Sequence, residues 1–191
     1  MRSTQDRLNL VLERIENPRF LTNDGLGNDI GFWIFDYPAG DECLVRDHLQ
    51  HLEQKLKQRG YKFLHLNIFS IILDMLTERN LLERVFQREK EVGLENLKKS
   101  LAGPLSQKNI SEYIARRYDP VSFDFVLLSG VGSAWPLVRA HELLSAMQNI
   151  MGNTPLVIFY PGKYSGQDLH PFGIVESRNY YRAFKLVPEQ G

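Results

Sequence analysis

The chain has little of what marks a secreted or membrane-spanning protein. Cys43 is the only cysteine among 191 residues, so no disulfide can form within the chain. The longest apolar runs, 123–129 and 155–160, are far shorter than the roughly 20 residues that a membrane-spanning helix needs. The first residues, 1–6, also lack the apolar run of a signal peptide. These absences predict a protein of the reducing cytoplasm, with no membrane contact.

An excess of charge of either sign is also missing. Lysine plus arginine number 23 and aspartate plus glutamate number 23, which leaves no net charge to attract a nucleic acid. The basic pairs Lys98-Lys99 and Arg116-Arg117 are too short and too far apart to form a basic stripe. Direct nucleic-acid binding is therefore disfavoured. The length suits one domain spanning residues 1–191.

Apolar runs alternate with amphipathic segments along most of the chain, which is typical of parallel strands covered by helices. The pattern predicts an α/β fold: a three-layer, doubly wound, mostly parallel five-stranded sheet, similar to a Rossmann fold or a degenerate P-loop NTPase. A helical insertion is expected at about 69–118. The strands are expected at 30–35, 61–67, 123–129, 156–160 and 181–187.

Three helix starts are predicted from local signals. Asp41 is a candidate cap for the helix that follows the first strand. A later helix is expected to begin near Asn109, with Glu112 completing a capping box. The helix after the third strand is expected to begin near Pro136.

In a doubly wound sheet, ligands bind beyond the carboxyl ends of the strands, which here means loops 36–41, 67–70, 129–135 and 160–167. A phosphate-binding loop after the first strand needs several glycines and a lysine. The segment 36–42 instead begins with Asp36 and Tyr37, holds one glycine and three carboxylates, and includes Pro38, which has no N–H. The third strand also ends without the carboxylate that positions a metal in such enzymes. Nucleoside-triphosphate hydrolysis is disfavoured.

The loop after the third strand carries the next candidates. Gly130 and Gly132 bring backbone close to a bound anion or simply allow a tight turn, and Trp135 stands where a dinucleotide site has its third glycine. Ser129 is not part of a Gly-x-Ser-x-Gly sequence, so a hydrolase is unsupported. Arg139 is placed to hold a carboxylate or phosphate, although a surface ion pair is the commoner role.

The loop after the fourth strand can be interpreted in two ways. Lys163, between Gly162 and Gly166, is able to receive an acidic group, and a solvated surface loop fits equally well. Tyr160 and Tyr164 add aromatic surface of a kind enriched at protein interfaces. The helix expected after the first strand carries two histidines, at 48 and 51, but no further ligand follows at metal-binding spacing. No metal or cofactor is predicted.

Several blocks, taken in order, resemble the BrxB family of BREX phage-defence operons. The likeness runs from about Phe20 to Pro188, and the ordered set is specific although no single block is. The blocks are Gly25–Ile30 running into Phe32–Pro38, His65–Phe69, Val126–Gly132 with Arg139–His141, Thr154–Tyr164 and Asn179–Phe184, and the sequence departs from the family pattern around Gly31 and at His170-Pro171.

This resemblance implies a small, non-catalytic component of a system that marks self DNA by adenine methylation and blocks phage replication. The system's chemistry is expected in a methyltransferase, a large ATPase and an alkaline-phosphatase-like protein of the PglZ type. The resemblance provides no catalytic residues to carry over. The expected role is an adaptor that binds the PglZ-type subunit, with the ATPase or methyltransferase as alternative partners.

Two functions follow, and they share one expected surface. The first is a protein-binding adaptor, and the alternative is a nucleotide or small-anion sensor or enzyme that uses the strand-end crevice without a standard P-loop. The expected partner or ligand surface consists of Asp36, Tyr37, Ser129, Gly130, Gly132, Trp135, Arg139, Tyr160, Gly162, Lys163, Tyr164, Tyr180 and Tyr181.

Overall fold

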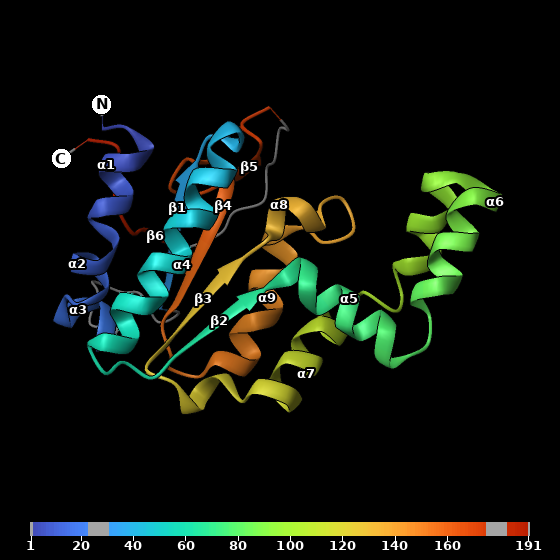
Figure 1. Ribbon diagram of the computed structural model, residues 1–191, viewed down its shortest axis with the longest axis horizontal. Helices are drawn as coiled ribbons and strands as arrows, with labels where there is room; N and C mark the ends of the chain where they lie inside the picture. The colour runs from blue at the N-terminus through green and yellow to red at the C-terminus, as the bar shows by residue number, and fades with distance from the viewer. Residues whose placement is uncertain (1, 23–30, 175–182, 191) are drawn as a thin grey trace.

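A mostly parallel β-sheet forms the centre of the molecule in the computed structural model, which describes residues 2–22, 31–174 and 183–190 (Figure 1). The strands run in the order β2-β3-β4-β1-β6, and β5 pairs antiparallel with the end of β4. The doubly wound α/β prediction is confirmed. The strands are β1 (Phe32–Tyr37), β2 (Phe63–Asn67), β3 (Phe125–Ser129), β4 (Leu156–Tyr164), β5 (Leu169–Pro171) and β6 (Phe184–Lys185).

Helices cover both faces of this sheet (Figure 1). The first face packs against α1 (Thr4–Asn9), α2 (Val11–Ile15), α3 (Pro18–Leu21) and α4 (Glu42–Gln58). The second packs against α5 (Ile68–Glu78), α7 (Gln107–Tyr118), α8 (Val131–Ala134) and α9 (Ala140–Met151). Along the sequence, α6 (Leu82–Leu101) follows α5 and precedes α7. Short 3-10 turns lie at Ala39–Asp41 and Pro120–Ser122. No helix in the described parts of the chain is both long and apolar enough to cross a membrane.

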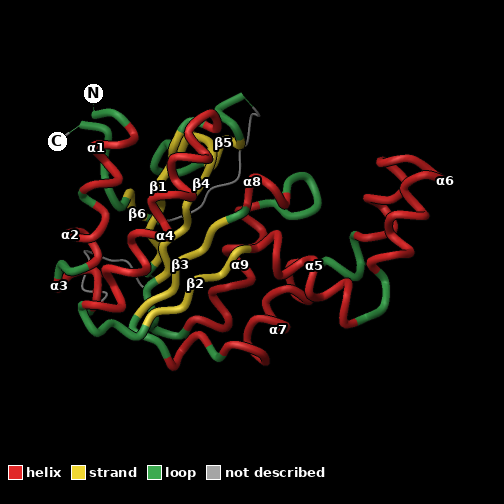
Figure 2. The backbone as a smooth tube through the Cα atoms, viewed as in Figure 1, coloured by secondary structure: helices red, strands yellow, loops and turns green. Residues whose placement is uncertain are grey.

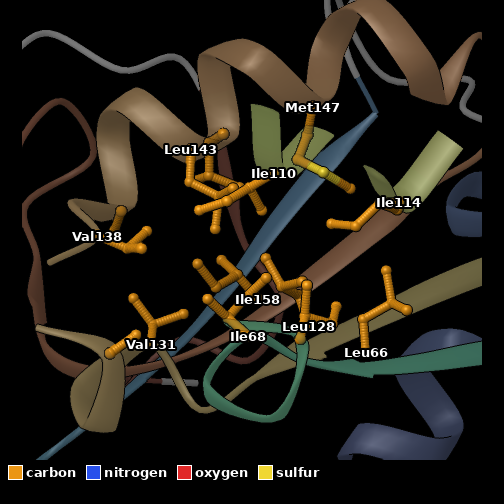
Figure 3. Close-up of a cluster of buried hydrophobic side chains, with 14 of the residues drawn as sticks. Leu66, Ile68, Ile110, Ile114, Leu128, Val131, Val138, Leu143, Met147 and Ile158 are labelled. Atoms are coloured by element: carbon orange, nitrogen blue, oxygen red, sulfur yellow. The ribbon is translucent and has the colours of Figure 1, made fainter. Parts of the chain in front are cut away.

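Alternating side chains of each strand supply the two cores, because successive residues of a strand point to opposite faces. On the α4 side, Phe35, Phe125 and Leu127 pack against Leu49 and Leu52. Figure 3 shows part of the opposite core, where strand residues meet α7, α8 and α9. Its labelled members are Leu66, Ile68, Ile110, Ile114, Leu128, Val131, Val138, Leu143, Met147 and Ile158.

The path of the chain explains which face each helix covers. After β1, α4 carries the chain past β4 and β3 to the far edge, where β2 lies. The chain then returns step by step through β3 to β4. Right-handed crossovers place helices on opposite faces for opposite directions of travel. The ends of β1 and its neighbour β4 are therefore where a ligand crevice is expected.

The predicted helical insertion is present as α5, α6 and α7. Figure 2 shows α6 standing away from the strands. Its path turns at Gly93, whose φ of 73° lies in the left-handed region that glycine adopts at little cost. Phe86 and Leu94 on α6 are 49% and 60% exposed, so this helix carries apolar surface that the body does not cover.

The sheet has six strands among the described residues, so the prediction of five is corrected. The strand expected at 156–160 continues to Tyr164 and turns back as β5, because the glycine- and proline-containing segment 161–164 pairs with 169–171. The strand expected at 30–35 is shifted to Phe32–Tyr37. The strand expected at 181–187 is present only as Phe184–Lys185, and residues 181 and 182 lie outside the described part.

The three predicted helix starts also differ. Ser106, not Asn109, caps α7, accepting a hydrogen bond from the Asn109 N–H. Asp41 makes no side-chain cap and instead accepts a hydrogen bond from Thr4. The segment after β3 forms α8 at once and breaks at extended Trp135, because a residue before proline is disfavoured in the helical region. The helix then resumes as α9.

Candidate functional site

The end of β1, where a nucleotide crevice is expected, is occupied by a buried charge cluster. Asp36 is 1% exposed and Arg7 of α1 is 3% exposed, and their side chains lie 2.7 Å apart (Arg7 Nη2 to Asp36 Oδ1). The other carboxylate oxygen accepts hydrogen bonds from the Tyr164 N–H and from Lys185 Nζ, each at 2.9 Å. Both oxygens of Asp36 are thus used within the protein.

The Arg7 guanidinium is satisfied in the same way. It donates to the Asp36 carbonyl at 2.6 Å and to the Val187 carbonyl at 3.0 and 2.9 Å, and it lies 4.7 Å from the centre of the Phe35 ring. A buried charge that is paired and fully hydrogen-bonded joins elements and is unavailable to a ligand. The Arg7–Asp36–Lys185 cluster therefore ties α1, β1 and the carboxyl-terminal segment together. Arg7 was not a predicted site residue, because nothing in a surface-like helix sequence marks its burial.

Gly130 and Gly132 after β3, and Gly162 near the end of β4, pack against the protein's own atoms instead of leaving room for a phosphate. A Cβ built on Gly132 would lie 2.6 Å from Pro161 Cγ, and one on Gly162 would lie 2.3 Å from the His170 carbonyl. At Gly130, whose φ is 74°, a Cβ would lie 2.3 Å from Asn67 Oδ1. Of the two readings of Gly130 and Gly132, this geometry favours tight packing of a strand-to-helix turn.

Three of the predicted aromatic surface residues are buried. Tyr37, Tyr160 and Tyr164 are 3%, 2% and 1% exposed, because β1 and the extended β4 carry them into the cores. Burial and a 2.6 Å hydrogen bond to Glu42 raise the pKa of Tyr37, and burial raises the pKa of Tyr160. The Tyr164 hydroxyl lies 2.9 Å from both the Gly166 and the Ala183 carbonyls, within donating distance of either. These three tyrosines do not form an accessible surface.

Trp135 is different: it is 42% exposed. Its ring meets that of Phe172 edge-on, with centroids 5.5 Å apart. Ile174, two residues after Phe172, is 84% exposed. We call these three residues the Trp135 rim. Arg139 and Lys163 are also exposed. Tyr180 and Tyr181, the other predicted aromatics, lie outside the described residues.

A second polar set lies at the end of β3, on the α4 side. Ser129 Oγ is 2.8 Å from His65 Nε2, and His65 Nδ1 is 2.5 Å from Glu53 Oε1. The three residues come from β3, β2 and α4. Ser129 is 6% exposed, while the side chains of His65 and Glu53 are 21% and 28% exposed. We call this set the Glu53–His65–Ser129 chain.

Of the three residues in the Glu53–His65–Ser129 chain, only Ser129 was a predicted site residue. In the parallel β2–β3 pair, His65 lies beside Leu127 and Asn67 beside Ser129, so His65 and Ser129 are two positions apart on one face. The register between the two strands, and the addition of Glu53 from α4, could not be read from spacing along the chain.

A depression of about 510 Å³ lies between α5 and α7, away from the strand ends. It is lined by Met75, Glu78, Arg79, Asn109, Glu112, Tyr113 and Arg116. The Tyr113 hydroxyl donates to Glu78 at 2.9 Å, and burial together with this hydrogen bond raises the pKa of Tyr113 to about 12. Arg117 also donates to Glu78. No group of three histidine, cysteine or acidic side chains suited to a metal ion occurs within the described ranges.

These features define a class: a doubly wound α/β protein whose strand-end crevice is filled by its own side chains, with an exposed tryptophan at the rim. A family model described as "BREX protein BrxB" matches residues 64–186. The chain belongs to the BrxB family of BREX systems, as the resemblance predicted, and is thus a component of a phage-defence system.

Two curated relatives agree over nearly the whole chain. "BREX protein BrxB" of Escherichia coli O9:H4 (strain HS) is 57% identical over 185 residues, which cover 97% of this chain and 92% of the relative. "BREX protein BrxB" of Bacillus cereus (strain H3081.97) is 36% identical over 194 residues, covering 98% and 99%. No solved structure matches this chain.

Proposed function

We propose that this protein is an adaptor subunit of its BREX system that docks on the PglZ-type protein through the Trp135 rim. One observation carries the proposal. The place where a doubly wound sheet binds its ligand is filled by Asp36, Pro161 and their neighbours, while a large aromatic side chain beside it remains 42% exposed. The ordinary ligand site is closed, and a protein-binding residue stands at its edge.

The chemistry of the rim suits a protein partner. Tryptophan and other aromatics are enriched among the residues that dominate binding energy, since they bury a large area with little loss of conformational freedom. Trp135 is held by its edge contact with Phe172. Gly132 in α8, three residues before Trp135, packs closely on Pro161. A rim fixed in this way loses little entropy on docking. We place this assembly in the cytoplasm.

Co-purification tests the proposal. The tagged chain is mixed with each co-encoded subunit separately, and we expect saturable capture of the PglZ-type protein. Capture of the ATPase or the methyltransferase alone would preserve the adaptor role and change the partner. A chain that remains monomeric and captures none of the co-encoded subunits would refute the adaptor role itself.

The alternative function, a sensor or enzyme for nucleotides or small anions, is tested by calorimetry. ATP, GTP and dinucleotides are titrated with magnesium. Because Asp36 places a carboxylate at the end of β1 and no lysine-bearing glycine loop is present there, we expect no binding heat. A saturable isotherm would revive the alternative.

A further inference from the structure

The Glu53–His65–Ser129 chain has the connectivity of a nucleophile, a base and an orienting acid. The hydroxyl oxygen faces one ring nitrogen of the histidine at 2.8 Å, and the carboxylate faces the other at 2.5 Å. A carboxylate at Nδ1 fixes the tautomer that leaves Nε2 free to accept the hydroxyl proton. Such sets are recognised by geometry and role, since they occur on unrelated folds without a common sequence motif.

The hydrogen bonds of the Glu53–His65–Ser129 chain differ from those of the structural cluster around Arg7 and Asp36. Within the described part of the molecule, the three side chains hydrogen-bond only to one another, whereas Arg7 and Asp36 also bind backbone carbonyls and N–H groups. The histidine and glutamate are partly open to solvent.

The position of Ser129 suits attack on a substrate. It is the last residue of β3, and Gly130 (φ 74°) turns the chain sharply into α8, so Ser129 lies at a strand-to-helix turn. β2 is the edge strand, and its last residue, Asn67, is exposed beside Ser129. Ser129 itself is 6% exposed, so the partly exposed His65 and Glu53 mark the side from which a substrate would reach it. This is the α4 side, whereas the Trp135 rim follows α8 on the opposite face.

We propose that Ser129 is a nucleophile toward small carboxylic esters, with His65 as general base and Glu53 as the positioning residue. A bond forms between Ser129 Oγ and the ester carbonyl carbon as His65 Nε2 takes the hydroxyl proton. The ester C–O bond then breaks, and the leaving alcohol takes that proton from His65. Water repeats the sequence on the acyl-serine, releasing the carboxylic acid and restoring the serine.

This activity goes beyond the proposed adaptor function and uses different residues, so the two can fail separately. The test treats the intact chain with a fluorophosphonate probe and with p-nitrophenyl acetate. We expect stoichiometric labelling mapped to Ser129, together with ester hydrolysis. Ser129→Ala should lose both. Ser133 is an exposed serine of α8 that is not part of the Glu53–His65–Ser129 chain, and Ser133→Ala should retain both activities.

Two further variants separate chemistry from structure. His65→Ala should label about 100-fold more slowly, the usual size of a general-base contribution, and added imidazole should restore part of the rate. Glu53→Gln should alter the pH profile of labelling while the Tm stays close to wild type. The proposal is overturned if the folded wild type is unlabelled, if label appears on another residue, or if His65→Ala and Ser129→Ala react like wild type.

Discussion

The ends of β1 and β3 lie two strands apart in the same sheet, and the protein uses them differently. At the end of β1, Asp36 is buried and every oxygen of its carboxylate is bonded to protein groups. At the end of β3, Ser129 is bonded to the partly exposed His65, and the chain soon reaches the exposed Trp135. The first strand end is sealed, whereas the second is buried at Ser129 but lies beside the partly exposed His65 and, further along the chain, the exposed Trp135.

This difference shows that a polar residue at a strand end is not by itself a ligand site. What separates the two ends is where their hydrogen bonds go. Arg7 and Asp36 bind each other, Lys185 and backbone groups of distant segments, which makes them part of the fold. Ser129 and His65 are instead bonded to side chains, of which His65 and Glu53 are partly exposed.

The largest effect is expected from Asp36→Asn at the sealed end. The substitution preserves the side chain's size but leaves the buried Arg7 without a counter-charge and places an amide against two donors. We expect a loss of about 3 to 5 kcal/mol in the free energy of unfolding, measured by urea denaturation. The matched control, Glu13→Gln at an exposed position of α2, should stay within about 0.5 kcal/mol. Equal losses for both variants would show that the buried cluster around Asp36 does not stabilise the fold in the way described.

A much smaller loss of stability is expected from Ser129→Ala at the open end. This variant removes one hydrogen bond to His65, whose ring can bind water instead, so the expected cost is about 1 kcal/mol. The same denaturation experiment measures it. A loss as large as that of Asp36→Asn would mean that Ser129 belongs to the structural framework after all.

The Tyr113–Glu78 pair between α5 and α7 is a reference away from both strand ends. Its tyrosine pKa is raised to about 12, so folding favours the neutral phenol; this stabilisation is complete below pH 10 and is lost as the pH rises toward 12. Glu78→Gln should lower the pKa of Tyr113, as followed by absorbance at 295 nm. Because the Glu78–Arg117 ion pair is exposed, the stability at pH 7 should change by less than about 1 kcal/mol. An unchanged titration would exclude Glu78 as a cause of the shift.

The sequence predicts more of the fold than of the site. Apolar runs and helix periodicity gave the doubly wound sheet and the insertion, because burial of a strand or a helix face leaves a local pattern. The pairing of Gly162 with Pro171, the burial of Arg7 and the meeting of His65 with Ser129 depend on contacts between distant segments. Tyr164 was expected at the surface because its loop is rich in turn-forming residues, yet β4 extends through it.

Partner capture by Trp135→Ala tests the central claim, that the Trp135 rim, and not the closed crevice at the end of β1, is the surface that binds a ligand. The matched control is Phe86→Ala, a similarly exposed aromatic (49% against 42%) on α6, and this helix stands away from the sheet (Figure 1). We expect Trp135→Ala to lower the affinity for the PglZ-type subunit at least tenfold, the loss of about 1.4 kcal/mol or more that marks an interface anchor, with an unchanged Tm. Phe86→Ala should bind like wild type. Full capture by Trp135→Ala, with loss in Phe86→Ala, would contradict the account and place the interface on the helical insertion.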